Sequence, residues 1–231
     1  MPESWMRMHR IDLGGVVLLP HLSGALHVPE LSALIISDLH LEQGTALARR
    51  GIRVPPYDTH LTLALLEEVV TLHAPERLIF LGDSFHDTEG EASLEPDIWE
   101  RLSALTKAHD CFWISGNHDP HPPQRLAGHA ADHIYLGPLL LRHEPRKLRE
   151  DEYEISGHLH PGCAIAQRGR RVSGKCFVAD KRRLIMPAFG AYTGALSVLT
   201  MPFAGLFDHE DAGTWLLGRD RIYKFPFARL A

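Results

Sequence analysis

Short apolar runs alternate with longer amphipathic segments in the first half of the chain. The apolar runs cover 34–36, 78–81 and 111–114, and each has the length of a strand. The segments 58–73 and 97–108 repeat apolar residues at spacings of three and four, which is the period of a helix. Strands that alternate with helices are typical of β-α-β units. We therefore predict a sheet with helices packed on it.

The segment 58–73 carries a clear helical pattern. Two residue types that cap helices, Asp58 and Thr59, stand at its start. We expect its buried face to consist of Leu61, Leu65, Leu66, Val69 and Leu72.

Beyond Gly116 the apolar runs become shorter and are separated by glycine, proline and charged residues. They cover 139–141, 177–178, 184–185 and 196–199. This pattern favours a second, mostly antiparallel sheet. The sequence contains no long Gly/Ser linker, internal repeat or low-complexity tract, so we expect one domain over 1–231. The expected fold class is α/β, with a two-sheet β-sandwich flanked by helices.

The composition is that of an ordinary globular protein. Of the 231 residues, 45% are hydrophobic and 23% are charged, which excludes the collagen-like, disordered and membrane-spanning classes. The net charge of −5 argues against a protein that grips a polyanion with its whole surface. Histidine is unusually frequent, at 16 residues.

Cysteine usage and the start of the chain bear on its compartment. Cys111, Cys163 and Cys176 are odd in number and lack a C-x-x-C spacing, so they suggest neither a disulfide framework nor a thiolate zinc site. The first ten residues lack a basic stretch followed by an apolar run, and no apolar run approaches the ~20 residues of a membrane helix. We expect a cytoplasmic protein without membrane association.

Polar residues follow three of the expected strands at the point where each strand ends. Ser37-Asp38-Leu39-His40 follows the first, Gly82-Asp83 the second, and Ser115 to Asp119 the third. In open α/β sheets, ligands bind in the crevice outside the carboxyl ends of the strands. Packing alone would not place Asp, Asp and Asn at three successive strand ends, so these residues indicate a binding site.

Two further pieces follow apolar runs in the second half. His143 comes directly after 139–142, and Gly157-His158-Leu159-His160 comes directly after Tyr153-Glu154-Ile155. In an extended backbone the two histidines of H-x-H would point to the same side. His143 is preferred over His129 and His133, which precede the apolar run.

Together these strand ends offer a mixed oxygen and nitrogen ligand set without sulfur. Such a set is too large for one tetrahedral ion and suits two ions that share a bridging carboxylate. Cys163, three residues after His160, is then expected to be a small buried hydrophobe. The candidate ligands are Asp38, His40, Asp83, Asn117, His143, His158 and His160.

Over 35–160 the chain resembles the calcineurin-like binuclear metallophosphoesterases. Their pattern of D-x-H, G-D, G-N-H-(E/D), H and G-H-x-H appears here in order and complete. The resemblance implies a four-layer α-β-β-α fold that hydrolyses phosphoesters with two divalent ions. It assigns one ion to Asp38, His40 and His160, and the other to Asn117, His143 and His158, with Asp83 bridging them.

The same resemblance places His118 beside the metals as a catalytic residue and makes Asp119 the residue that orients it. Protonated His118 would stabilise charge on the phosphate oxygens or donate its proton to the leaving oxygen. The ligand set is compatible with manganese, iron or zinc and argues against magnesium.

Longer motifs resemble one bacterial subfamily, the ligase-associated DNA-damage-response phosphoesterases. The motifs are Leu39-His40-Leu41-Glu42 with Gly44, 82–87, 157–161, and the late run 187–194. This resemblance implies a manganese-dependent endonuclease in DNA repair, with single-stranded DNA as its partner and a DNA ligase and helicase in its functional cluster.

Three groups of residues are candidates for substrate binding. His86 and Asp87 lie close behind Asp83 and could reach the substrate or form a turn with a helix cap. Arg49 and Arg50 could bind a phosphate or remain solvated. The run 189–194 could line the site or form a tight turn, and we favour the turn.

The charge is distributed unevenly. Residues 142–186 contain 11 lysines and arginines against 6 acidic residues, a local charge of +5 that leaves −10 on the rest. A basic lobe next to two metals suits a phosphodiester backbone, although strand edges also carry cations to prevent edge pairing. From this lobe we predict DNA contacts by Arg170, Arg171, Arg182 and Arg183.

Two other functions remain compatible with the sequence. One is a phosphoesterase that acts on a cyclic or nucleoside phosphate. The other is a non-catalytic scaffold for a protein partner, which the complete ligand set and His118 disfavour.

Overall fold

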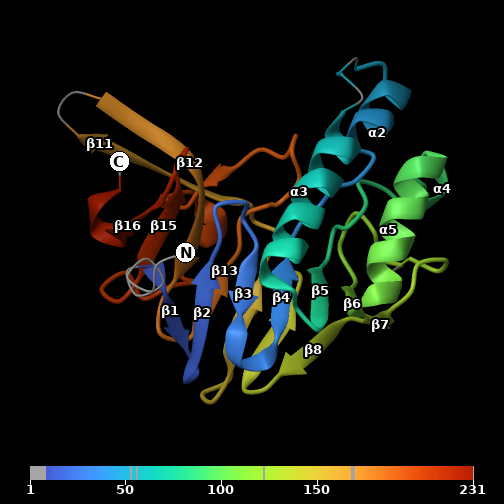
Figure 1. The fold of residues 1–231 in the computed structure, drawn as a ribbon. Coiled ribbons are helices and arrows are strands. Elements are labelled where there is room, and N and C mark those ends of the chain that lie inside the picture. Colours follow the sequence, from blue (N-terminus) through green and yellow to red (C-terminus); the bar gives the residue numbers. More distant parts are fainter. Residues whose placement is uncertain (1–8, 53, 56, 122, 168–169, 231) are drawn as a thin grey trace.

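In the computed structural model, two β-sheets pack face to face and helices cover the outer face of the first (Figure 1). The structure describes residues 9–52, 54–55, 57–121, 123–167 and 170–230, with only the backbone described for 167 and 170. The helices are α2 (Gln43–Arg49), α3 (Asp58–His73), α4 (Gly90–Ser93) and α5 (Pro96–Ala108).

The first sheet has seven strands, which pair in their order along the chain. Strands β4, β5 and β6 are parallel, as the β-α-β pattern predicts. The seven strands are β1 (Ile11–Leu13), β2 (Val16–Pro20), β3 (Leu26–Val28), β4 (Ala33–Ile36), β5 (Arg77–Leu81), β6 (Asp110–Ile114) and β7 (His129–Ala131).

The second sheet has nine strands and is mixed. Most of its pairings are antiparallel, as expected, but β9, β10 and β13 run parallel to one another. Of the run 196–199, only Leu196–Ser197 forms a strand. The nine strands are β8 (His133–Leu136), β9 (Leu139–Arg142), β10 (Tyr153–Ser156), β11 (Pro161–Gln167), β12 (Arg170–Ala179), β13 (Arg183–Ile185), β14 (Leu196–Ser197), β15 (Gly213–Leu217) and β16 (Ile222–Pro226).

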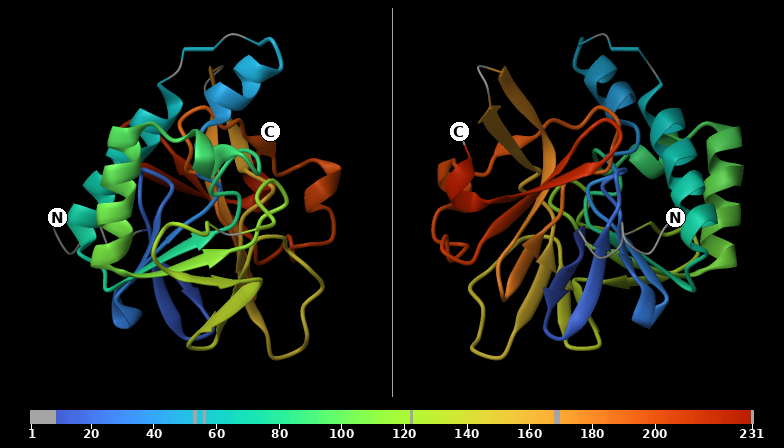
Figure 2. Two further views of the ribbon diagram at one scale, coloured as in Figure 1. Left: turned by 90° about the vertical axis from the view of Figure 1, so that its right-hand side faces the viewer. Right: turned by 60° about the vertical axis from the view of Figure 1, so that its left-hand side comes forward.

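Alternating side chains divide the core into layers. In β4, Ala33 and Ile35 point between the two sheets, whereas Leu34 and Ile36 point toward the helices. The strand is buried on both faces, which is why it reads as a continuous apolar run. Helices α3 and α5 lie side by side over the sheet (Figure 2), joined by an ion pair between Arg101 and Glu67 at 2.7 Å.

The expected architecture of two sheets flanked by helices is confirmed. In the described part of the chain, the outer face of the second sheet packs on short 3-10 helices and loops, including Phe203 and Phe227, instead of α-helices. Within the same residues, the helices are all too short or too polar to cross a membrane.

The predicted bounds of α3 are confirmed, but two residues of its predicted buried face are wrong. Leu66 and Val69 are buried, whereas Leu61 and Leu72 are more than half exposed. Thr59 and Thr62 turn inward instead, because their hydroxyls accept hydrogen bonds from Glu42 N and Ala191 N.

The predicted cap residues of α3 serve another helix. Asp58 accepts a hydrogen bond from Gly44 N at 2.9 Å, and Thr59 accepts one from Glu42 N at 2.8 Å. Both donors lie at the N-terminal end of α2, where backbone N–H groups lack partners within the helix. These bonds fix the segment that follows Asp38 and His40 against α3.

Candidate metal centre

Loops after five parallel strands meet at one edge of the two sheets. The loops after β4 and β5 are joined by hydrogen bonds from Asp38 N to Gly82 O at 3.2 Å and from His40 N to Asp83 O at 2.9 Å. The loops after β9 and β10 are joined by Gly157 N and His143 O at 3.0 Å. These backbone bonds hold Asp38, His40 and Asp83 in one pair of loops and His143, His158 and His160 in another, and Asn117 comes from the loop after β6.

Asp38, His40 and His160 form the first donor cluster. Nε2 of His160 lies 3.2 Å from Oδ1 of Asp38 and 3.3 Å from Nε2 of His40. The three ligand atoms that they offer lie within 4.8 Å of one another. This set could hold one divalent ion, and it matches the first set implied by the sequence.

Asp83, His143 and His158 form the second cluster, and Asn117 completes it. Oδ1 of Asn117 lies 2.7 Å from Nδ1 of His158 and 3.0 Å from Nε2 of His143. The Nδ1 atom of His143 is 3.0 Å from Leu81 O, so an N–H there donates to the carbonyl and leaves Nε2 as the ligand. The second predicted set is therefore also brought together.

Asp83 lies between the two clusters. Its Oδ1 accepts a hydrogen bond from His118 N at 2.8 Å. Its Oδ2 lies 3.3 Å from Nε2 of His143 and 3.8 Å from Nε2 of His40. One carboxylate oxygen thus faces a histidine from each cluster, which is the position that a bridging ligand requires.

Five of the seven candidate ligands have left-handed backbone conformations. The φ angles are 54° for Asp38, 45° for His40, 46° for Asp83, 66° for His158 and 44° for His160. Such backbones cost of order 1–3 kcal/mol each and cluster at functional sites. The expectation that an extended backbone aligns His158 with His160 is wrong, since these turns send the two rings to different clusters.

Two glycines permit the close approach of the ligand loops. A Cβ atom on Gly157 would overlap the Ser37 hydroxyl and crowd Asp38. A Cβ atom on Gly116 would overlap Oδ1 of Asp83. The glycines that precede the histidines and Asn117 in their motifs therefore make room for the carboxylates.

The carboxylates stay ionised despite burial. Burial alone would raise the pKa of Asp83, but the hydrogen bond and charge of His143 outweigh it and lower the pKa to about 2. Burial lowers the pKa of His40 to about 4, against the attraction of Asp38 and Asp83. Burial would lower the pKa of His143, but its hydrogen bond to Asp83 and the charges of Asp38 and Asp83 raise it to about 9, so this ring must lose a proton when it binds a metal. With that proton released, the carboxylate oxygens and imidazole nitrogens are the donor set for two divalent transition-metal ions.

His118 adjoins the site, but its expected partner is wrong. The Asp119 carboxylate accepts hydrogen bonds from Ser84 N at 2.8 Å and Phe85 N at 3.1 Å, so it anchors the loop behind Asp83. His118 instead places Nδ1 3.0 Å from the His86 carbonyl oxygen. An Nδ1–H that donates there leaves Nε2 of His118 free on an exposed ring.

The loop after Asp83 also brings His86 to the site. Its ring centroid is 5.1 Å from that of His118 and 5.4 Å from that of His40. Burial lowers the pKa of His86, and the charges of His118 and Arg50 add to this effect, so Arg50 acts on the same region. Asp87 forms a turn with Glu89 N and pairs with Arg49 at 2.5 Å, which commits both of them to structure.

Of the arginines predicted to contact DNA, some are buried or already bonded within the protein. Arg183 is 4% exposed and binds Glu154 at 2.6 Å, so its prediction as a DNA contact is wrong. Arg182 donates to the backbone carbonyl oxygens of Arg149 and Glu152, which makes it a structural clamp. Arg171 is exposed on β12.

Arg170 is the fourth of these predicted contacts. Its side chain lies outside the described residues.

The structure also separates His143 from the two alternative histidine ligands and places Cys163. His129 is exposed and lies 3.5 Å from Asp110, and His133 is also exposed, whereas His143 is buried in the second cluster. Cys163 is buried in the apolar layer behind the second sheet, as expected.

Sequence reasoning missed Lys175. Its ammonium group donates to Ala188 O at 2.8 Å, Gly190 O at 2.9 Å and the Thr193 hydroxyl at 2.7 Å. Burial lowers its pKa to about 8, against the attraction of Asp38. The loop that it holds donates hydrogen bonds from Phe189 N and Gly190 N to the backbone of Ser37 and Asp38, so the run 189–194 lies against the metal site.

The sequence model of the calcineurin-like phosphoesterases matches residues 31–174, more than half of the chain. The chain belongs to this family. Calcineurin-like phosphoesterases are metal-dependent hydrolases whose fold binds two divalent ions, and the two clusters described above fit that number. Among the described residues, His40, His86 and His118 form a third group whose ligand atoms lie within 4.8 Å of one another, and it shares His40 with the first cluster.

One solved structure shares the fold of this chain. The chain is similar to the nuclease MPE from Pseudomonas putida, with 28% identity and a TM-score of 0.70 over 94% of this chain and 98% of that chain. It is also similar to Yfce, a phosphoesterase from E. coli, with 13% identity and a TM-score of 0.41 over 84% and 98% of the two chains. Among curated proteins, none matches this chain significantly.

Proposed function

We propose that this calcineurin-like phosphoesterase is a manganese-dependent DNA endonuclease. The observation that carries the proposal is the place of Asp83, whose Oδ2 faces His40 of one donor cluster and His143 of the other. Two ions that share a carboxylate can clamp both the attacking and the leaving oxygen of a phosphodiester. This geometry therefore supports direct hydrolysis without a covalent phosphoenzyme.

In this proposal, the metal ligands hold the two ions and His118 transfers a proton or stabilises charge. Two divalent ions held by the two donor clusters would supply an activated water and would neutralise charge on the phosphate. His118 has its Nδ1 held by the His86 carbonyl, so Nε2 is the atom that stabilises the phosphate oxygens or protonates the leaving oxygen. His86, from the loop after β5, lies with its ring centroid 5.1 Å from that of His118 and adds a second imidazole beside it.

The choice of DNA over a small phosphoester rests on two supports. The Pseudomonas putida protein that shares 94% coverage with this chain is a nuclease. The β11–β12 hairpin extends away from the body of the fold in Figure 1, and Arg171 is an exposed residue of β12. An exposed cation on this hairpin could neutralise a phosphate of a long strand.

The finer assignments extend the same proposal. Manganese suits a cage of imidazole, carboxylate and amide donors, and iron or zinc are the alternative ions. We place the protein in cytoplasmic DNA repair, acting on DNA with single-stranded character together with a ligase and helicase cluster. These assignments follow from the subfamily resemblance.

One assay separates the candidate functions. The protein is incubated in Mn²⁺ with a covalently closed single-stranded DNA circle, with cyclic nucleotides, and with bis-p-nitrophenyl phosphate. Linearisation of the circle supports the endonuclease. Hydrolysis of the small substrates alone supports the small-molecule phosphoesterase. No hydrolysis of any of the three substrates supports the non-catalytic scaffold. Asp83→Ala, purified in parallel, controls for contaminating nucleases.

A further inference from the structure

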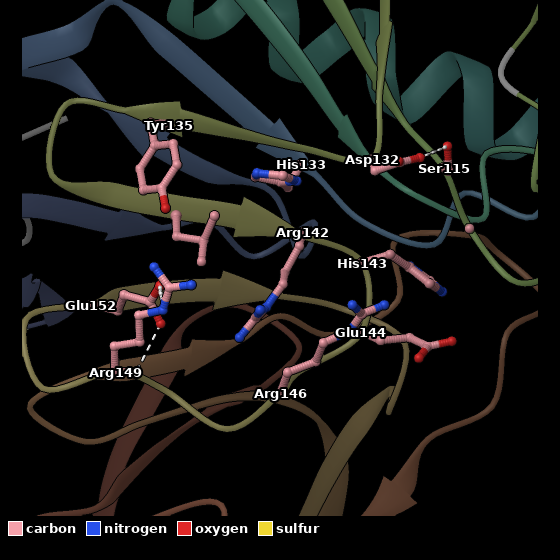
Figure 3. A pocket seen from close by; sticks show the side chains of 12 residues that line it. Ser115, Asp132, His133, Tyr135, Arg142, His143, Glu144, Arg146, Arg149 and Glu152 are labelled. Carbon is pink, nitrogen blue, oxygen red and sulfur yellow. Dashed lines mark hydrogen bonds and ion pairs between the residues drawn. The ribbon is translucent and has the colours of Figure 1, made fainter.

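A pocket of 660 Å³ opens beside the second donor cluster. Its walls come from β8, β9 and the loop that follows β9, and His143 shares one of them (Figure 3). This volume falls within the range of about 300–1,000 Å³ that is typical of small-molecule sites. The lining includes His133, Tyr135, Arg142, His143, Arg146 and Arg149.

An exposed aromatic ring lies at the end of the pocket away from His143 in Figure 3. The side chain of Tyr135 is 61% exposed on β8, and its hydroxyl points toward Arg149 and Glu152. His133 lies two residues earlier on the same face of the strand, with its ring centroid 6.1 Å from that of Tyr135. A large ring held on a strand and left uncovered can stack on a base.

Among the described residues, Arg146 is the arginine of the pocket whose guanidinium is not in an ion pair. Arg142 is paired with the fully buried Glu154, and Arg149 lies 3.8 Å from Glu152. Among the described residues, the guanidinium of Arg146 has no ion-pair or hydrogen-bond partner, and in Figure 3 it extends toward the side where His143 lies.

The backbone of Arg146 is fixed from both sides. Its N–H donates to Glu154 at 3.3 Å, and its carbonyl oxygen accepts a hydrogen bond from Arg183. The buried ion pair between Arg183 and Glu154 therefore positions Arg146 instead of binding DNA.

The charge balance of the walls selects the class of ligand. The lining holds the three arginines and the three acidic residues Asp132, Glu144 and Glu152, and Arg142 is also paired with Glu154, so the pocket has no excess of positive charge that would bind free anions. Asp132 is already bonded to the Ser115 hydroxyl at 3.2 Å. The guanidinium of Arg146 and the carboxylate of Glu144 remain near the metals, with one aromatic face further out. The guanidinium can bind the phosphate and the ring can stack on the base of one nucleotide.

We propose that this pocket is the subsite for the nucleotide next to the scissile phosphate, with its base on Tyr135 and its phosphate on Arg146. The subsite rests on the proposed function. It lies on the Asn117, His143 and His158 side of the metal centre, because His143 is the residue that the pocket and the second cluster share.

The test compares DNA cleavage with hydrolysis of bis-p-nitrophenyl phosphate, which has no neighbouring nucleotide. Because stacking of a base is worth about 1–3 kcal/mol, Tyr135→Ala should lower the ratio of the two kcat/KM values about 5- to 150-fold. Tyr135→Trp should restore it. Arg146→Ala should lower the same ratio and reduce the salt dependence of DNA binding by about one phosphate contact.

Matched controls exclude general effects. Lys147→Ala removes the neighbouring charge outside the pocket lining, and Tyr223→Ala removes an exposed tyrosine on β16. Both should keep the wild-type ratio. An unchanged ratio in Tyr135→Ala and Arg146→Ala, or equal loss on both substrates, would overturn the subsite.

If the proposed function is wrong, the wild-type protein will not cut DNA in Mn²⁺, which differs from the outcomes that overturn the subsite. The subsite is then tested by fluorescence anisotropy with a short single-stranded oligonucleotide. Wild-type binding that weakens in Tyr135→Ala and Arg146→Ala supports the pocket as a nucleotide site. Wild-type binding that the variants leave unchanged, or no binding, contradicts it.

Discussion

Nε2 of His143 lies 3.3 Å from Oδ2 of Asp83, although the two residues follow strands of different sheets. This contact joins the loop after β5 in the first sheet to the loop after β9 in the second sheet. It exists because β5 and β9 both end at this edge with their next residues turned toward each other. The metal centre is therefore a product of sheet packing, and its ligands act as a unit.

Asp83→Ala should abolish turnover. The variant removes the one oxygen that faces both donor clusters and leaves buried histidines without their charged partner. The measurement is hydrolysis of bis-p-nitrophenyl phosphate in saturating Mn²⁺, with circular dichroism to establish that the variant folds. His158→Ala should give the same loss by removing a ligand of the second cluster, and substantial activity in either folded variant would refute its assigned role.

His118→Ala should slow turnover by about 10²- to 10⁴-fold, the usual contribution of a positioned acid or base. Both ions should stay bound, because the contact between His118 and Asp83 is made by the backbone N–H and survives the substitution. The check combines kcat with metal content for the same sample. Loss of an ion together with activity would mean that His118 is a ligand.

Lys175→Met should lower the free energy of unfolding by roughly 2–3 kcal/mol, because it leaves buried acceptors without a donor. For a chain of this size that corresponds to a Tm lower by roughly 4–12 °C. The variant should also lose kcat, since the loop that Lys175 holds is bonded to the backbone of Ser37 and Asp38. Lys181→Met, at a surface ion pair with Asp211, is the matched control and should keep the wild-type Tm.

Three histidines outside the set of metal ligands, namely His21, His27 and His73, should make the protein less stable in acid. The rings of His21 and His27 lie 5.4 and 4.3 Å from the ring of His73. Burial, with repulsion from His73, lowers the pKa of His21 and of His27 to about 4. The unfolded chain titrates near 6.5, so it takes up protons first as the pH falls.

The free energy of unfolding should therefore fall between about pH 6.5 and pH 4, and His27→Gln should fall less steeply than wild type. Urea unfolding of EDTA-treated protein at pH 7.5 and pH 5 measures the difference. The exposed His129→Gln is the control and should match the wild-type slope. Equal slopes for His27→Gln and wild type would contradict the role of the cluster.

Sequence reasoning succeeded where the signal is local. The runs at 34–36 and 78–81 are buried on both faces, so their continuous apolar character predicts β4 and β5 directly. The ligands follow such runs, and the spacing of D-x-H and H-x-H stays within one loop. The expected fold class and family are both confirmed.

It failed where a distant partner decides the role of a residue. Arg183 looks like part of a surface charge run, yet it pairs with Glu154, which precedes it by 29 residues. Thr62 looks like a solvent residue of α3, yet it bonds to Ala191 N. Asp119 looks like the partner of His118, yet its carboxylate accepts hydrogen bonds from the N–H groups of Ser84 and Phe85. Periodicity and spacing carry no information about these contacts.

The most direct test of the two-metal account is the metal content of the protein, measured by inductively coupled plasma mass spectrometry after dialysis against saturating Mn²⁺. The account predicts two manganese ions per chain in the wild type and fewer in Asp83→Ala, whose carboxylate faces both positions. One ion or none in the folded wild-type protein would contradict it.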